Sequence, residues 1–140
     1  MLCIVDTNKL FSAVFKRGAA RAVLLFSPVR FVTLEYALDE LDEHKGELMS
    51  RAGITLDEYR FILNEVVLPA LEVYSVEFIC DVRGEALSIA REFRPDDWLF
   101  IALALKLGAA IWTDDGDMIE YSRRSRRFRV VSTRELLYML

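Results

Sequence analysis

Five short apolar runs recur along the chain, and longer stretches with apolar residues at helical spacing lie between them. The runs occupy residues 2–5 (LCIV), 30–33 (RFVT), 76–79 (VEFI), 110–113 (AIWT) and 129–132 (RVVS). Each run is almost continuously hydrophobic, which is typical of strands that other layers cover on both faces. We therefore predict a sheet of roughly five strands, one from each run.

The intervening stretches predict helices at residues 7–15, 19–27, 34–50, 55–72, 84–93 and 96–107, and shorter ones at 118–124 and 133–140. The stretch 55–72 opens with TLDE, which fits a capping box, and Pro69 predicts a kink near its end. Strands that alternate with helices indicate an α/β sandwich with a mostly parallel sheet. At 140 residues, the chain is expected to form one domain over residues 1–140.

Acidic residues fall where such a sheet binds ligands. That place is the carboxyl edge of the strands, where each crossover helix also begins. Glu40 lies about 9 Å along its predicted helix from the helix start, so a long side chain there can still reach the same edge. Four separate segments thus deliver acids to one edge, namely Asp6, Glu40, the pair Asp96 and Asp97, and the pair Asp115 and Asp117.

Each acid alone also has a simpler interpretation. Asp6 fits an N-cap, and Asp96 and Asp97 fit the favourable first turn of a helix. Glu40 fits a solvated acidic face, and the stretch DDGD fits a turn. Together, however, carboxylates that gather without cations raise one another's pKa and destabilise the fold. A hard divalent cation would relieve this repulsion, and oxygen ligands without His or Cys favour Mg²⁺ or Mn²⁺ over zinc.

The composition is that of a compact protein. Hydrophobic residues make up 54% of the chain, which excludes a disordered protein. The net charge of −4 argues against non-specific binding of polyanions over the whole surface, although it allows a local basic patch. Charges or Pro69 interrupt the long apolar runs, and MLCIVDTNK has no basic segment before its apolar run. We therefore expect a cytoplasmic protein without a membrane span or signal peptide.

Other reactive residue types offer no alternative chemistry. Cys3 and Cys80 each lie in an apolar run, so we predict two reduced core thiols. His44 is the only histidine and is predicted on a solvated helix face. With Ser12 and Ser122 it forms no triad pattern, which argues against acyl transfer.

Basic residues near the predicted edge are candidates for binding phosphate groups. One group follows Asp6, and a second lies in the stretch RRSRRFR after the last acids. Arginine can bind phosphates and stack on unpaired bases, but a solvated helix end that suits the helix dipole is an equal alternative. The candidates are Lys9, Lys16, Arg17, Arg21, Arg123, Arg124, Arg126 and Arg127.

Four pieces of the sequence, taken in order, resemble the PIN domain family. They are IVDTN, LDELDEHK, PDDWLFIALAL and IWTDDGDM, and together they span nearly the whole chain. The resemblance implies a three-layer α/β/α sandwich with a parallel sheet. It also implies a metal-dependent ribonuclease, and many such proteins are VapC-type toxins paired with an antitoxin.

Carried over motif by motif, the resemblance gives roles to individual residues. The implied catalytic acids and metal ligands are Asp6, Glu40 (with Asp39 as the fallback), Asp97 and Asp115, and Asp117 is an auxiliary metal ligand. Asn8 and Thr113 match polar positions that hold the acids by hydrogen bonds. Asp114 stands where the family often has a small residue. One ion, or two ions roughly 4 Å apart, would be Mg²⁺ or Mn²⁺.

The leading interpretation is therefore an endoribonuclease that hydrolyses RNA phosphodiester bonds with a bound metal. Its implied partners are RNA, a small antitoxin protein and, through the apolar stretch ELLYML, a second copy, although packing of that stretch on the core is preferred. The alternative is a catalytically silent PIN-like module that binds RNA or protein. Phosphotransfer of the haloacid-dehalogenase kind is disfavoured because Asn8 stands where a second Asp is needed.

Overall fold

One parallel sheet forms the centre of the computed structural model, which describes residues 1–140. Its strands run in the order β3-β2-β1-β4-β5 and every neighbouring pair is parallel. The order reverses at β1, so the carboxyl ends of β1 and β4 form the switch point at which such sheets bind ligands. The strands are β1 (Leu2–Val5), β2 (Arg30–Leu34), β3 (Leu71–Tyr74), β4 (Ala110–Trp112) and β5 (Arg129–Val131).

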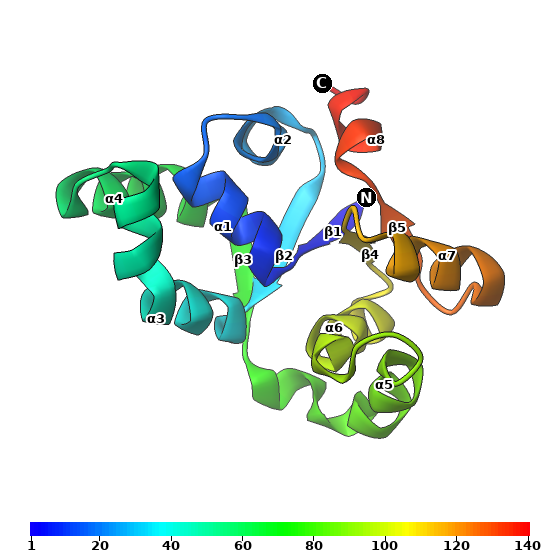
Figure 1. Cartoon of the computed structure of the whole chain (residues 1–140). Helices are drawn as coiled ribbons and strands as arrows, with labels where there is room; N and C mark the ends of the chain where they lie inside the picture. The colour runs from blue at the N-terminus through cyan, green and yellow to red at the C-terminus, as the bar shows by residue number, and fades with distance from the viewer.

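Helices cover both faces of the sheet and complete the predicted three-layer α/β/α sandwich (Figure 1). Figure 1 shows α1 and α2 on one side of the strands, and α5 and α6 on the other. A π-helical turn (Ile62–Val67) and a 3-10 turn (Leu68–Ala70) follow α4, and 3-10 segments precede α5 (Val76–Val82) and α6 (Pro95–Asp97). The α-helices are α1 (Thr7–Phe15), α2 (Ala19–Phe26), α3 (Glu35–Ala52), α4 (Leu56–Phe61), α5 (Arg83–Ala90), α6 (Trp98–Leu107), α7 (Gly116–Ser125) and α8 (Thr133–Leu137).

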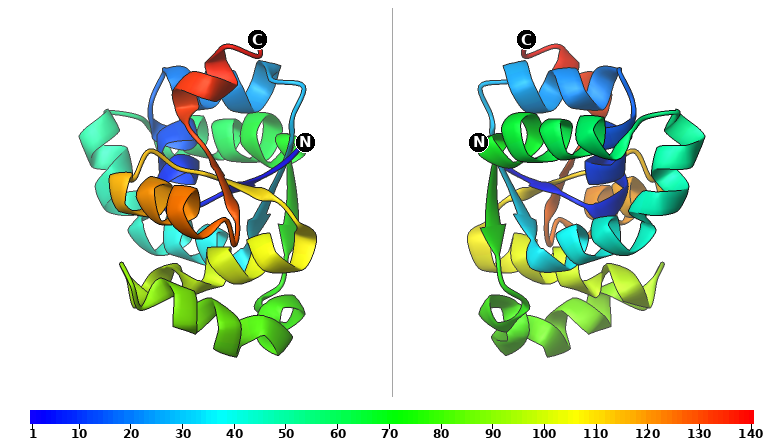
Figure 2. Two further views of the ribbon diagram at one scale, coloured as in Figure 1. Left: turned by 90° about the vertical axis from the view of Figure 1, so that its right-hand side faces the viewer. Right: turned by 90° about the vertical axis from the view of Figure 1, so that its left-hand side faces the viewer.

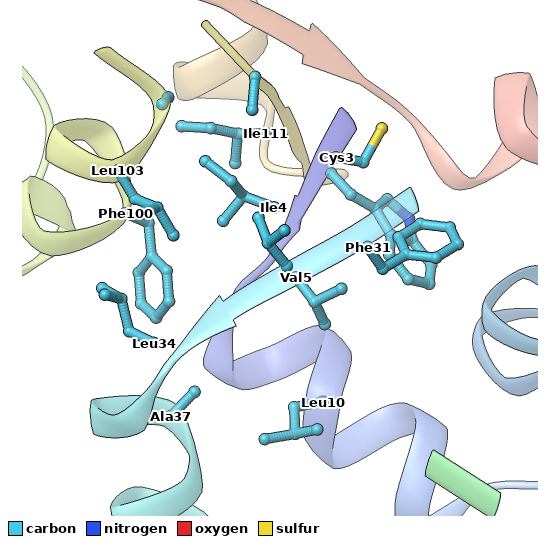
Figure 3. Close-up of a cluster of buried hydrophobic side chains, with 14 of the residues drawn as sticks. Cys3, Ile4, Val5, Leu10, Phe31, Leu34, Ala37, Phe100, Leu103 and Ile111 are labelled. Carbon is cyan, nitrogen blue, oxygen red and sulfur yellow. The ribbon is translucent and has the colours of Figure 1, made fainter. Parts of the chain in front are cut away.

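Burial of β1 from both sides explains its uninterrupted apolar sequence. Ile4 and Val5 are completely buried, and they belong to one core cluster of 35 buried residues. Figure 3 shows Phe100 and Leu103 of α6 on one side of β1 and Leu10 of α1 on the other. The core therefore fixes the ends of the central strands, from which the candidate site is built.

The third strand is not where the sequence pattern predicts it. The apolar run 76–79 lies in a 3-10 segment, and the strand is the stretch LEVY, whose first residues fall in the predicted helix 55–72. As an edge strand, β3 leaves Glu72 and Val73 exposed, so it lacks the continuous hydrophobicity of the inner strands. The run 76–79 is apolar because Ile79 is fully buried in the core cluster and the 3-10 segment packs against α6.

Two further predictions in this region need correction. The helix predicted at 55–72 ends at Ala70, where Pro69 lies in the closing 3-10 turn, because proline cannot donate the hydrogen bond that would continue a helix. The thiol of Cys80 is exposed and not part of the core, whereas Cys3 is buried as predicted. The predicted capping box at Thr55 and Glu58 is confirmed.

The C-terminal helix packs on the core through a single buried apolar residue. Leu136 is fully buried, and α8 contacts α2. Leu137 is 39% exposed and Tyr138 is 77% exposed, so most of the apolar stretch ELLYML faces outward. No helix of the chain combines the length and the apolar character that crossing a lipid bilayer requires.

Replacing Leu136 tests whether α8 is part of the folded core. Leu136→Ala removes a buried side chain and should lower the free energy of unfolding by about 2–3 kcal/mol, which urea denaturation can measure. Leu137→Ala is the matched control, and its effect should stay within roughly 0.5 kcal/mol because that side chain is partly exposed. Equal effects of the two substitutions would contradict the docking of α8 on α2.

Candidate active site

A small polar pocket of about 330 Å³ lies at the switch point of the sheet. Val5 pairs with Trp112 across β1 and β4, so the residues after these strands emerge side by side. The segment before α6 closes the third side. The pocket is lined by Asp6, Asn8, Lys9, Arg94, Asp97, Thr113, Asp114, Asp115 and Met118, of which only the methionine is hydrophobic. Three of the predicted acids thus meet in one place.

Asp6 acts both as a helix cap and as a wall of the pocket. Its Oδ1 accepts a hydrogen bond from the backbone N–H of Lys9 at 2.9 Å, which caps α1. Its second carboxylate oxygen accepts no hydrogen bond and stays available to a ligand. Burial raises the pKa of Asp6, and the charge of Asp97 raises it further, although the hydrogen bond and charge of Lys9 oppose both effects. The two interpretations of Asp6 from sequence are therefore compatible.

Asp115 is fixed in the pocket by its neighbours. Its Oδ1 accepts the backbone N–H of Asp117 at 3.0 Å and caps α7. Its own N–H donates to Oγ1 of the buried Thr113 at 3.1 Å, and the N–H of Thr113 donates to the carbonyl of Val131 in β5 at 3.0 Å. The Thr113 hydroxyl thus bonds the backbone of Asp115 and not a carboxylate, and its supporting role stays a prediction. Asp115 Oδ2 is buried, and its only partner is the guanidinium of Arg94.

Arg94 supplies positive charge that the sequence motifs did not reveal. Its Nε lies 3.1 Å from Asp97 Oδ2, and its Nη2 pairs with Asp115 Oδ2. The guanidinium therefore bridges two of the four pocket carboxylates. Since the Arg94 side chain is largely exposed, it can leave the carboxylates without disturbing the core. The spacing from Arg94 to Asp97, three residues apart, was the available sequence signal.

Asp114 belongs to a separate, structural network. Its carboxylate pairs with Lys9, accepts the backbone N–H of Thr133 at 3.0 Å and accepts the Thr133 hydroxyl at 2.7 Å. The indole N–H of Trp112 donates to the same hydroxyl at 2.9 Å. Partial burial would raise the pKa of Asp114, but the bonds from Lys9 and Thr133 outweigh it and hold that pKa below its ordinary value. The extra acid therefore joins β4, α1 and α8.

Glu40 and Asp117 do not line this pocket. Glu40 Oε2 lies 3.5 Å from Nε2 of His44, one turn further along α3. The ligand atoms of Glu40, Glu43 and His44 lie within 4.8 Å of one another and could hold a metal ion. The exposed position predicted for His44 is observed, but beside two acids. Asp117 faces a neighbouring pocket with Glu92 and Tyr121.

Some of the basic candidates bind other groups of the chain, and others form no ion pair. Lys9 is bound to Asp114, and the Arg21 guanidinium donates to the carbonyls of Ala13 and Val14 at the end of α1. Both side chains thus have structural partners. Arg124 lies 3.9 Å from Glu92, and Arg127 lies 3.0 Å from Glu85. The remaining candidates form no ion pair, and they are Lys16, Arg17, Arg123 and Arg126.

The lowered pKa of Asp114 makes its contribution to stability pH-dependent. Asp114→Asn should lower the free energy of unfolding by about 1 kcal/mol at pH 7, after a discount for solvent screening of this half-exposed group. For an acid whose pKa is lower in the folded state, that contribution is complete above the unfolded-state pKa and is lost as the pH falls through the folded-state pKa. Urea denaturation between pH 7 and pH 3 should therefore show the difference from wild type shrinking in acid. A difference independent of pH would contradict this interpretation.

Comparison with known proteins agrees with the fold. The family model described as PIN domain matches residues 4–135, which is almost the entire chain. No curated protein sequence matches. PIN domains are commonly nucleases and typically use divalent metals, and the five parallel strands between two helical layers are the arrangement that the sequence motifs implied. The chain belongs to the PIN domain family.

Proposed function

We propose that this PIN domain protein is a metal-dependent endoribonuclease whose active site is the pocket of Asp6, Asp97 and Asp115. The observation that carries the proposal is the meeting of Asp6, Asp97 and Asp115 in one pocket, where the buried Oδ2 of Asp115 has only the Arg94 guanidinium as a partner. Such an oxygen is costly to bury unless a cation lies against it. Arg94 occupies that position and is exposed enough to give way to a divalent ion. The switch point of a parallel sheet is also the expected location for a ligand.

The residues of the pocket fit a hard divalent cation. Their donor atoms are carboxylate oxygens with an amide and a hydroxyl nearby, and no Cys or His lines the pocket. Oxygen donors of this kind favour Mg²⁺ or Mn²⁺. Asp6, Asp97 and Asp115 would hold the ion. Glu40, the fourth acid implied by the family motifs, would join them only if its side chain turned away from His44.

Mg²⁺ or Mn²⁺ bound there would lower the pKa of a water molecule and offset negative charge on the scissile phosphate. The protein's own contribution is orientation. Asp6 and Asp115 are held by helix-capping hydrogen bonds, so their free oxygens occupy fixed positions. Arg94, displaced from Asp97 and Asp115, could bind the substrate phosphate through two parallel N–H groups. Asn8 on the pocket wall offers an amide to the same substrate.

A catalytically silent module is the second candidate. It is favoured by the ion pairs of Arg94 with Asp97 and Asp115, which satisfy two of the three proposed metal ligands from within the chain. Such a protein would bind RNA or another protein without cleaving it. The toxin role, the antitoxin partner, the homodimer and the cytoplasmic location stay predictions from the sequence.

Replacing Asp97 tests the proposed reaction. Asp97→Asn should lower Mn²⁺-dependent cleavage of single-stranded RNA by about 100-fold or more, because it removes a charged ligand from the site. Asp96→Asn is the matched control, since Asp96 is exposed, adjacent and absent from the pocket wall. Glu40→Gln shows whether the acid on α3 takes part. If wild-type protein binds RNA but never cleaves it with Mn²⁺, the silent module is correct.

Replacing Asp6 tests the fit of a metal through stability. The raised pKa of Asp6 means that its ionised form opposes folding as the pH rises from the unfolded-state pKa through the higher folded-state pKa. Asp6→Asn keeps the helix cap and should therefore raise Tm at pH 7 without metal, with a smaller gain at pH 4. Mn²⁺ should raise Tm of the wild type more than Tm of the variant. An equal response to Mn²⁺ would place the ion away from Asp6.

A further inference from the structure

A second pocket, of about 580 Å³, lies at the far end of α7 from the acids. Its walls come from the last turns of α7, from β5 and from the residues around α8, which lie together in Figure 2. Three arginines line it, Arg123 and Arg126 from α7 and its C-cap and Arg129 from β5. Glu135 is the only acid on its walls. The pocket is therefore strongly positive.

The arginines of the stretch RRSRRFR divide into two groups. Arg124 and Arg127 face the α5 side of the molecule and pair with Glu92 and Glu85. The three arginines of the pocket form no ion pair. Glu135 forms no ion pair with them, and its carboxylate accepts hydrogen bonds from the backbone N–H and the hydroxyl of Ser132 at 3.3 and 3.2 Å. One carboxylate offsets only part of the charge of three arginines, so the pocket keeps a net positive charge.

Neutralisation of the helix dipole explains only part of this arrangement. Cations in the last turn of α7 suit its negative end, and Arg123 and Arg124 lie there. Arg129 lies on β5 and gains nothing from that dipole, yet it lines the same pocket. The chain as a whole carries a net charge of −4, so a positive cluster of this kind is a local exception that would attract an anion.

We propose that this arginine pocket, formed by Arg123, Arg126 and Arg129, binds the phosphate backbone of the RNA at a distance from the cleavage point. The inference rests on the proposed function. α7 is capped at one end by Asp115 in the acidic pocket and carries Arg123 near its other end. Ten helical residues span about 15 Å, so only an oligonucleotide, and not a single nucleotide, occupies both pockets.

The pocket would recognise the phosphate backbone of the RNA and not its base sequence. Phe128, the only aromatic side chain on its wall, is buried and stacks on Tyr121 with ring centroids 5.8 Å apart, so it offers no free face to a base. Arginine forks match phosphate oxygens, and phosphate contacts position a nucleic acid without specifying its bases. An acidic protein segment is the competing ligand. RNA is favoured because α7 connects this pocket directly to the proposed cleavage site.

The test compares two double substitutions that remove the same charge. Arg123→Gln/Arg129→Gln alters the arginine pocket, and Arg124→Gln/Arg127→Gln alters the ion-paired arginines of the same stretch. Binding of a fluorescent 12-nucleotide single-stranded RNA is measured by anisotropy at several salt concentrations, with Asp97→Asn present to prevent cleavage. The pocket variant should bind about 10-fold more weakly. Its plot of log affinity against log salt should be shallower by about 0.7 for each phosphate that the variant no longer neutralises.

The control variant should keep wild-type affinity and salt dependence. In proteins with Asp97 intact, the pocket variant should raise KM for the same RNA with Mn²⁺, and circular dichroism melting checks that each variant folds. Should the pocket variant not fold, Arg123→Gln alone, on an exposed side chain, replaces it. Equal weakening by both double variants, or none by either, would overturn this inference and leave cleavage by the wild type intact. Failure of the wild type to bind or cleave RNA would remove the proposed function as well.

Discussion

Repulsion among carboxylates that cannot move apart is the constraint on which the candidate site depends. Asp6 and Asp115 each cap a helix through one oxygen, so the backbone holds them where β1 and β4 end. Asp97 joins them from the segment before α6. Burial and the nearby charge of Asp97 raise the pKa of Asp6, so the folded state does not fully compensate this charge. The hydrogen bonds that cap two helices therefore also hold the carboxylates close together. A divalent ion would offset their mutual repulsion.

Two cationic side chains, Lys9 and Arg94, contact the acids of this region, and they differ in how they are held. Lys9 is bound to Asp114 within a network that includes Thr133 and Trp112, so its charge is part of the structure. Arg94 instead reaches the carboxylates from an exposed position, and in the proposed reaction it would give way to a divalent ion. This difference separates a charge that holds the fold together from one that the proposed reaction could use.

Helix α7 connects the two charged regions of the molecule. Its N-terminal end carries Asp115 and Asp117, and its last turn carries Arg123 and Arg124, as the helix dipole favours. The distribution of charge that stabilises α7 is thus also the one that the proposed metal binding and RNA binding would need. The acids gather where a metal would bind, and the unpaired arginines gather where a phosphate backbone would lie.

Local patterns along the chain were enough to predict the buried strands, most helices and the three acids of the pocket. Continuous burial and helix capping leave such patterns, as in LCIV and TLDE, and the reversal of strand order at β1 brings Asp6 and Asp115 to one edge. Three-dimensional packing was needed to find the edge strand LEVY, whose exposed residues hide the strand pattern, and the orientation of Glu40 toward His44. The pairing of Arg94 and the division of the arginines also emerged only from the folded chain. The contacts of Arg94 with Asp115 and of Arg127 with Glu85 join distant segments, which no periodicity along the chain records. The contacts of Glu40 with His44 and of Arg94 with Asp97 are local, but spacing alone does not decide which partner a side chain takes.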